Sequence, residues 1–503
     1  DNIVDDPGVA VTPTAITEYQ VDRFNRVAQI TDAREQEWIY RHDELDNLVS
    51  VTDPREHTTV YNYDVREYRR EVELPEDVTI LGDNNKIIET RNDNGDLKNI
   101  TTPRLNTWSQ KHDKMRRRLE MTTPVNTSFG VTARNAGGQS TGFTVGGRDV
   151  ATPRDAGSRV KQKTPPLPLA PTTCEYEVGG VSKVVAGETL EMEIDRKADG
   201  SVEAVTKDKT GKNIVQELNQ NGNLQLVQSD IENIISGAVA RSRALEYDTM
   251  GRPKKLTSNS AEWTIDRDGH GNILDITSPG LGSMEMRYDA MSNLKSIKRN
   301  GARETTYEYD KNGNLKTMDP PGPLKVQYKY NKRDMLYERT WNVSGVDKKR
   351  EVFYRDSEGN IWMHDIISEN GDVEWWAYFE RDEMGRVTDV QTSDTLTRGL
   401  GYSGDNQVTL DAVGDKSYKV QHNDAGLVSE TSGSPHFNYA YNGLGLLTSV
   451  TRDGSVIYSN EYDTAGHLVK TIDTASSLGG SKTIEYNADS IGYGWNRTLP
   501  QGV

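Results

Sequence analysis

The sequence predicts an all-β chain of repeated antiparallel hairpins, and three observations lead to this fold class. A short motif returns along the chain at nearly constant spacing. The segments on both sides of the motif alternate apolar and polar residues, which is the pattern of a half-buried strand. Only 34% of the 503 residues are hydrophobic, whereas 44 are glycine. That composition fits a thin, solvated β-structure better than several thick cores.

The motif consists of an aromatic residue, Asp or Asn, two variable residues, Gly or a small polar residue, one further residue, and then Leu, Ile or Val. Its clearest copies begin at Tyr247-Asp248, Tyr309-Asp310 and Tyr462-Asp463. Further copies, some with Arg, His or Val in the aromatic position, are Val21-Asp22, His42-Asp43, Tyr63-Asp64, Arg267-Asp268, Tyr288-Asp289, Tyr330-Asn331, Arg355-Asp356, Arg381-Asp382, His422-Asn423 and Tyr441-Asn442.

The spacing of these copies argues against disorder, which low hydrophobicity and high charge would otherwise favour. Asp22, Asp43 and Asp64 lie 21 residues apart, and the same step separates Asp268 from Asp289 and recurs twice more up to Asn331. From Asp356 to Asn487 the steps are 19 to 26 residues. A phase kept over so much chain indicates a repeat architecture.

Each copy is interpreted as one hairpin. Asp at the first position of a type I turn accepts backbone N–H groups two residues on, and Gly at the fourth position supplies a positive φ. The aromatic residue ends a strand, where we expect its ring to pack and its hydroxyl to remain in water. A second turn follows about ten residues later, as at Thr52-Asp53-Pro54 and Arg452-Asp453-Gly454, which closes the meander. About 18 hairpins give about 36 strands.

Residues 122–175 interrupt the rhythm with stretches such as Ala136-Gly137-Gly138 and Pro165-Pro166-Leu167-Pro168. This composition favours an exposed insertion or linker loop, and the alternative is a segment threaded inside or across the repeats. We therefore divide the chain into a repeat block at 1-121, the insertion at 122-175 and a second repeat block at 176-503.

Charge and cysteine content exclude several classes of protein. Sixty Lys and Arg oppose 77 Asp and Glu, a net charge of −17, which argues against a nucleic-acid binder. Cys174 is the only cysteine, so neither an internal disulfide nor a cysteine-based zinc site can form. No apolar stretch approaches 18 residues, so we expect no membrane span. The first residues lack the basic and apolar regions of a signal peptide and the chain begins within the pattern, so we expect a mature or cut-out product.

No catalytic, cofactor-binding or metal-binding residue is assigned, and no cofactor is expected. The eight histidines, at 42, 57, 112, 270, 364, 422, 436 and 467, are interpreted as variable repeat positions because none has metal-ligand spacing. Acidic turns such as Asn92 to Asp96 lack the order of a calcium loop. Trp362-Met363-His364 and Trp375-Trp376 are the densest aromatic spots. We interpret them as packing, with a sticky patch for unfolded cargo or sugar rings as the alternative.

The copies at Tyr247-Asp248 and Tyr309-Asp310, together with residues 51–64, resemble the YD repeats of the Rhs family, which toxin-complex B and C components and teneurins share. The similarity covers roughly residues 15–120 and 190–490. It implies a long antiparallel sheet that spirals into a hollow shell, and in bacterial members the shell encloses a toxic C-terminal domain. The family's self-cleavage motif has no match, since Asp5-Asp6-Pro7-Gly8 shares only a dipeptide with it, and no spike domain is visible.

The resemblance leads to expectations about function. At about 4.8 Å between strands, the ribbon would run on the order of 170 Å, enough for a partial hollow shell or barrel that a partner chain or missing sequence completes. We expect a secreted, non-enzymatic shell segment that encloses and helps deliver a toxic cargo domain, exported by a specialised bacterial secretion system for interbacterial competition. The acidic charge favours a basic cargo. The alternative is an extracellular adhesion module that binds glycan or protein.

Overall fold

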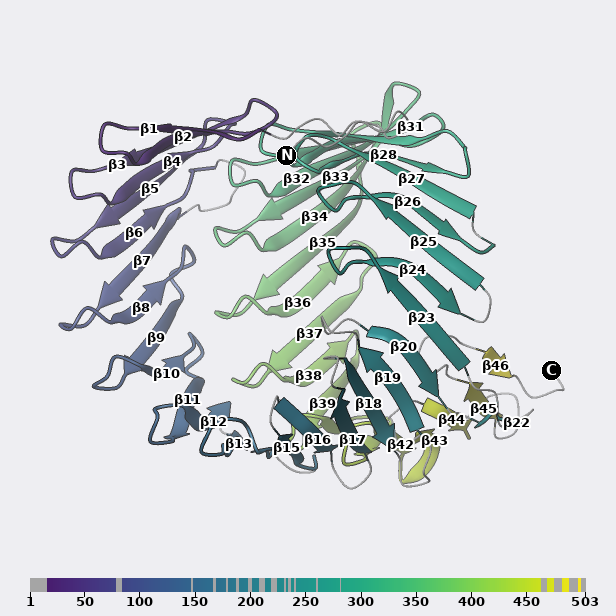
Figure 1. Cartoon of the computed structure of the whole chain (residues 1–503). Helices are drawn as coiled ribbons and strands as arrows, with labels where there is room; N and C mark the ends of the chain where they lie inside the picture. Colours follow the sequence, from purple (N-terminus) through teal and green to yellow (C-terminus); the bar gives the residue numbers. More distant parts are fainter. Residues whose placement is uncertain are drawn as a thin grey trace. The chain divides into compact units, whose positions relative to one another are not determined.

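A computed structural model gives the fold of the chain (Figure 1). The described residues are 16–77, 84–145, 148–165, 169–177, 180–186, 190–197, 201–207, 213–218, 224–229, 232–233, 237–238, 241–258, 261–280, 282–462, 468–474, 482–487 and 496–498. Across these ranges all regular structure is β-strand, with no helix, and every strand pair with a known register is antiparallel. The predicted all-β fold of antiparallel hairpins is confirmed.

The first sheet contains 13 strands in chain order. They are β1 (Glu18–Val21), β2 (Val27–Thr31), β3 (Glu37–His42), β4 (Leu48–Thr52), β5 (Thr58–Tyr63), β6 (Arg69–Glu73), β7 (Lys86–Arg91), β8 (Leu97–Thr101), β9 (Thr107–His112), β10 (Arg118–Thr122), β11 (Ser128–Arg134), β12 (Ser140–Val145) and β13 (Arg148–Ala151).

The second sheet contains 31 strands, again in chain order, and β21 (Glu232–Asn233) with β22 (Gly237–Ala238) forms a separate pair. The strands of this sheet are β14 (Gln162–Lys163), β15 (Thr172–Glu177), β16 (Gly180–Ala186), β17 (Leu190–Arg196), β18 (Val202–Lys207), β19 (Asn213–Leu218), β20 (Leu224–Ser229), β23 (Arg241–Tyr247), β24 (Pro253–Ser258), β25 (Ala261–Arg267), β26 (Ile273–Ser278), β27 (Gly282–Tyr288), β28 (Leu294–Arg299), β29 (Thr305–Tyr309), β30 (Leu315–Asp319), β31 (Leu324–Tyr330), β32 (Leu336–Val343), β33 (Val346–Arg355), β34 (Ile361–Ser368), β35 (Val373–Arg381), β36 (Val387–Thr392), β37 (Thr397–Tyr402), β38 (Val408–Val413), β39 (Lys416–His422), β40 (Val428–Ser432), β41 (Phe437–Tyr441), β42 (Leu447–Arg452), β43 (Ser455–Tyr462), β44 (Leu468–Asp473), β45 (Lys482–Asn487) and β46 (Asn496–Thr498).

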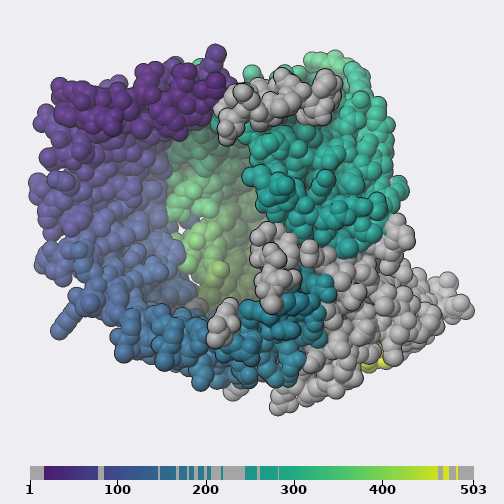
Figure 2. Space-filling view, viewed as in Figure 1, coloured from purple at the N-terminus to yellow at the C-terminus, as the bar shows by residue number. Residues whose placement is uncertain are grey.

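The chain divides into two compact units. Unit 1 combines Asp1–Val125 with Thr264–Arg398, and unit 2 combines Asn126–Trp263 with Gly399–Val503. Each unit therefore joins an early stretch of the chain to a later one. Within unit 1, the side chains of neighbouring strands touch along β1 to β6, drawn in purple in the space-filling view (Figure 2).

Much of the segment at 122–175 differs from the expected loop, because β11 to β14 lie within it and β15 begins in it. Two turns there follow the repeat geometry although an arginine replaces the aromatic residue: Arg134 donates to the carbonyl of Gly138 at 2.9 Å, and Arg154 to that of Ser158 at 2.7 Å. The described strands number 46, more than the about 36 expected, and those of this segment account for part of the difference. Residues 166–168 of the proline run lie outside the described residues, and the three-block division stays a prediction.

The predicted turn geometry is confirmed at Asp310. Its Oδ1 accepts from the backbone N–H groups of Asn312 at 3.0 Å and Asn314 at 2.9 Å. The N–H of Gly313 donates to the carbonyl of Asp310 at 3.1 Å, and Gly313 has a φ of +90°. The strand register shifts by one residue directly before the turn, which is the bulge of a three-residue hairpin loop. The copy at Asp463 lies outside the described residues, as does His467.

We expect the carboxylates of these turns to make the fold sensitive to acid. The pKa of Asp22 is lowered from 3.8 to about 2, chiefly because the Arg26 side chain donates to it. The pKa values of Asp113 and Asp248 are lowered chiefly by backbone N–H donation from Arg117 and Arg252. A carboxyl whose pKa is depressed on folding stabilises the fold above its unfolded pKa, and loses that contribution as pH falls through its folded pKa.

We therefore expect the fold to be stable at pH 5 and to lose stability between about pH 4 and about pH 2. Far-UV circular dichroism across an acid titration measures this. Asp248→Asn keeps the acceptor oxygen without the titration, so its turn should contribute less to the pH dependence. Unfolding that is complete well above pH 4 would contradict the assignment to these carboxyls.

The tyrosine before each turn ties one repeat to the previous one. The hydroxyl of Tyr309 donates to the backbone carbonyl of Leu294 at 2.8 Å, and that of Tyr330 donates to the carbonyl of Leu315 at 2.9 Å. In both cases the acceptor is the leucine five residues after the Asp of the preceding turn. Burial raises the pKa of both tyrosines. The expectation that these hydroxyls stay in water is wrong, because the neighbouring hairpin presents a backbone acceptor to them.

Arginine in the same position makes the same contact. Arg355 Nη2 donates to the carbonyl of Leu336 at 3.0 Å, while its Nη1 donates to Gly359 of its own turn at 2.7 Å. Arg381 repeats both contacts with Ile361 and Gly385, at 3.1 and 2.9 Å. Burial lowers the pKa of Arg355. The copies with arginine are therefore equivalent to the tyrosine copies in the way that they connect hairpins.

In unit 1 the two faces of the first sheet differ in character. Cross-strand partners lie on the same face of a sheet and successive residues on opposite faces. The register places an apolar stripe on one face of β1 to β9: Tyr19, Ile30, Trp38, Tyr40, Val51, Tyr61, Val72, Ile87, Ile100 and Trp108. The opposite face carries Arg41, Glu71, Glu73 and Lys86, and Lys86 forms ion pairs with both glutamates.

The apolar stripe is only partly covered. Of its residues, Val72 alone is fully buried, at 7% exposure, and the others are half-buried or exposed. Over the described residues, fully buried side chains are more often polar than apolar. This agrees with a single-layer, solvated sheet without a thick core, as the composition predicts.

Candidate functional site

Two rows of turns meet within unit 1, and their contacts define what we call the turn seam. One row belongs to the first sheet, in the turns that begin at Asp32, Asp53 and Thr102. The other row belongs to the second sheet, in the turns at Asp310, Asn331, Asp356 and Asp382. Contacts between residues more than 250 positions apart in sequence join the rows.

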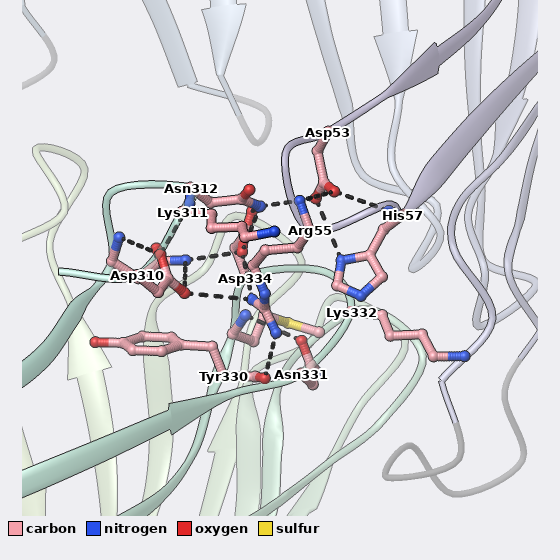
Figure 3. Close-up of polar contacts among 12 residues, drawn as sticks. Asp53, Arg55, His57, Asp310, Lys311, Asn312, Tyr330, Asn331, Lys332 and Asp334 are labelled. Carbon is pink, nitrogen blue, oxygen red and sulfur yellow. Dashed lines mark hydrogen bonds and ion pairs between the residues drawn. The ribbon is translucent and has the colours of Figure 1, made fainter. Parts of the chain in front are cut away.

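Arg55 is the central residue of the turn seam (Figure 3). Its Nη1 lies 2.8 Å from Asp334 Oδ1 and 3.6 Å from Asp310 Oδ2, and its Nη2 donates to the carbonyl of Tyr330 at 2.8 Å. Asn312 reaches back across the seam, donating to Asp53 Oδ2 at 2.7 Å. The side chain of Arg55 is 21% exposed, so these charge-assisted bonds form in a partly desolvated place.

Further contacts extend the turn seam on both sides of Arg55. Arg34 donates to the carbonyl of Lys311 at 3.5 Å, and Arg104 Nε lies 3.4 Å from Asp356 Oδ2. Thr102 donates to Glu358, and the carbonyl of Pro75 accepts from Arg333 at 2.9 Å. Three arginines at the third position of their turns thus reach the opposing row.

Unit 2 contains contacts of the same kind. Arg148 Nη2 lies 2.5 Å from Asp405 Oδ2, in the turn after β37. The backbone N–H of Ala170 donates to the carbonyl of Gly443, in the turn after β41, at 3.0 Å. Within each unit, therefore, an early stretch of the chain is held against turns of a later stretch.

A cavity of about 620 Å³ lies beside the turn seam in unit 1. Trp38, Val51, Ile87 and Ile100 of the apolar stripe form one wall. The turns at 332–335 and 357–359 of the second sheet form another. The volume is in the range of small-ligand sites, which are commonly apolar with a few polar groups.

Four of the described histidines occupy the repeat positions that the sequence predicts. His42, His112 and His422 are the last residues of β3, β9 and β39, directly before a turn, and His270 lies within a turn. His57 Nδ1 lies 3.2 Å from Asp53 Oδ2 beside the seam. Among the described residues no group of three His, Cys, Asp or Glu side chains could hold a metal ion, and no helix there is long and apolar enough to cross a membrane.

The two aromatic spots are divided between the faces of the second sheet. Trp375 pairs with Ile366, whereas Trp376 pairs with Asp365 on the other face. The His364 ring stacks on Phe353 at 4.7 Å and meets Trp375 edge-on at 5.5 Å. Burial among these rings lowers the pKa of His364. His364 and Trp375 therefore pack against neighbouring side chains, as expected.

Sequence reasoning missed the turn seam. Asp53-Pro54 indicates a turn, and the sequence alone assigns no role to the arginine that follows it. A signal was present, because Asp32-Ala33-Arg34, Asp53-Pro54-Arg55 and Thr102-Pro103-Arg104 all place arginine third in the turn. The partners of these arginines could not be inferred, since they lie in another part of the chain.

Comparison with known proteins supports this fold. The sequence profile described as RHS Repeat matches residues 21–58. A search of curated proteins found no match. A crystal structure of TcdB2–TccC3 matches 95% of this chain and 30% of that chain, at 13% identity and a TM-score of 0.56. The Photorhabdus luminescens Tc holotoxin pore matches 95% of this chain and 32% of its own, at 11% identity and a TM-score of 0.58.

Residues 21–58 therefore contain a recognisable RHS repeat, and the predicted resemblance is confirmed. The fold of the chain is similar to that of chains in Tc toxin structures. A structure of TcdB2–TccC3–TEV gives a similar result, with a TM-score of 0.57 at 11% identity. The chain spans about a third of the length of the chains that it matches.

Proposed function

We propose that this chain is a non-enzymatic wall segment of a secreted toxin complex, which holds a toxic cargo polypeptide against its apolar face. The partly uncovered stripe from Tyr19 to Trp108 carries this proposal. A contiguous apolar surface on a soluble protein marks an interaction site. An unfolded chain can place apolar side chains along such a stripe without a fixed sequence.

The second sheet of unit 1 offers a comparable face. Tyr307, Met318, Val326 and Trp341 are successive cross-strand partners from β29 to β32. Glu308, Thr317 and Gln327 occupy the opposite face. The mechanism is steric: the wall keeps cargo away from proteases until release, and further chain or a partner completes the enclosure. The net charge of −17 favours a cargo of basic character.

Adjacent isoleucines on opposite faces test this function. Ile87 lies in the stripe, and Ile88 lies on the charged face at 38% exposure. Reduced lysozyme with carboxamidomethylated cysteines, a modification that adds no charge, serves as an unfolded basic probe. We expect Ile87→Glu to weaken binding of this probe about tenfold, since a charge replaces buried apolar contact, and Ile88→Glu to leave it nearly unchanged. Equal effects of the two variants on fluorescence-measured binding would refute the proposal.

The second candidate is an adhesion module. Tyr354 and Tyr378 are cross-strand partners of Met363, on the face of the second sheet that also carries Gln327. The ring of Trp362 lies 5.7 Å from Tyr354 and 6.2 Å from Tyr378. Clustered rings on an otherwise polar face suit a saccharide or a protein ligand. A glycan array separates this function from cargo enclosure.

A further inference from the structure

The charges around the 620 Å³ cavity are not balanced. Three acids border it, and each has partners: Asp334 with Arg55 at 2.8 Å, Glu358 with Arg104 at 3.7 Å, and Asp53 with His57 at 3.2 Å. Lys332 borders the same cavity. Its side chain extends past His57, and its amine contacts none of the residues drawn in Figure 3.

Lys332 is thus a cation beside an apolar wall, and none of the ion pairs found among the described residues involves it. Its backbone is fixed, because its N–H donates to Asp77, a carboxylate only 3% exposed. The side chain itself is exposed. The backbone anchor places Lys332 at the edge of the cavity, and the three carboxylates that border the cavity already have partners of their own.

We propose that this cavity anchors the cargo through an apolar segment that is flanked by an acidic residue. The cavity would take one or two large apolar side chains against Trp38, Val51, Ile87 and Ile100, and Lys332 would pair with the flanking carboxylate. The occupant is an extended polypeptide because the cavity wall continues directly into the apolar stripe. The inference rests on the proposed cargo function. It adds a local preference for an acidic residue at the cavity, whereas the net charge of −17 favours a basic cargo as a whole.

Two fluorescein-labelled peptides test the proposal. Both contain the same Leu-Trp-Leu core, one flanked by Asp and the other by Lys. The net charge of −17 alone would make the chain prefer the basic peptide. We expect the wild-type chain to bind the acidic peptide roughly two- to fivefold more tightly at physiological salt, the range of one partly exposed ion pair.

Lys332→Glu should reverse this preference, and Lys316→Glu is the matched control, since that exposed lysine lies outside the residues that line the cavity. A change in preference is a readout that a loss of folding would not produce. Preference for the basic peptide by the wild-type chain, or the same shift in both variants, would overturn the proposal. If the lysozyme probe still binds Ile87→Glu more weakly than Ile88→Glu in that case, the proposed cargo function is retained and only the acidic anchor is refuted.

Discussion

Replacing Arg55 by Ala is expected to open the turn seam locally, at a cost of about 2–3 kcal/mol. The variant loses a charge-assisted bond to Asp334 and another to the carbonyl of Tyr330, and each such bond contributes about 1.5–3 kcal/mol. Asp310 and Asp334 remain close together without their shared cation. Since Asp334 is 40% exposed, water compensates part of the loss, and the estimate stays near the cost of one bond.

Hydrogen exchange measures this opening. Amides in the turns at 53–57 and 331–335 should exchange roughly 30- to 150-fold faster, the factor that corresponds to the expected free energy. Arg66→Ala is the matched control. Arg66 also stands third in its turn, but its partners are Asp64 at 3.8 Å and the carbonyl of Asp93, which both belong to its own row. Equal protection changes in the two variants would show that the seam adds no stability.

The second large effect is expected at Tyr309. Tyr309→Ala removes both a packed ring and the hydrogen bond to Leu294, so we expect a loss of about 3–4 kcal/mol. A loss of this size lowers the Tm of a unit of this length by roughly 6–16 °C. Tyr309→Phe keeps the ring and should cost only about 1 kcal/mol. Differential scanning calorimetry of the full chain measures both variants.

Tyr309→Arg distinguishes the connecting contact from simple packing. Because Arg355 and Arg381 reach the equivalent carbonyl, arginine at 309 should recover most of the stability that alanine loses. Leucine is the control, since it fills space without a donor. Should leucine stabilise the chain as well as arginine does, the inter-repeat hydrogen bond would have little importance and ring packing would explain the tyrosine.

The sequence was sufficient for the parts of the fold that are local. An Asp that accepts from its own turn, and a strand that alternates, depend on neighbours within a few residues, so periodicity reveals them. The turns at Asn135 and Asp155 are hidden in the sequence, because an arginine stands in the aromatic position and the surrounding composition is rich in glycine. The destination of the Tyr309 hydroxyl was missed because its acceptor is 15 residues away.

The turn seam and the cavity are not local. Arg55 and Asp334 are separated by 279 positions, and no periodicity in one sequence specifies which turn of a later row lies opposite a given arginine. Likewise, the apolar stripe could be predicted strand by strand. The cavity forms where the apolar stripe lies beside the turn that contains Lys332. Its position depends on how two sections of unit 1 that are distant in sequence contact each other.

The contact between each tyrosine or arginine and the preceding hairpin has an evolutionary consequence. Because a repeat interacts mainly with its neighbours, duplication or deletion of one 21-residue unit changes the length of the ribbon and disturbs few other residues. Across the seam the same event would shift every arginine to a different opposing turn. The number of repeats can therefore vary in stretches whose turns contact no second row of turns. It is constrained where two rows of turns contact each other.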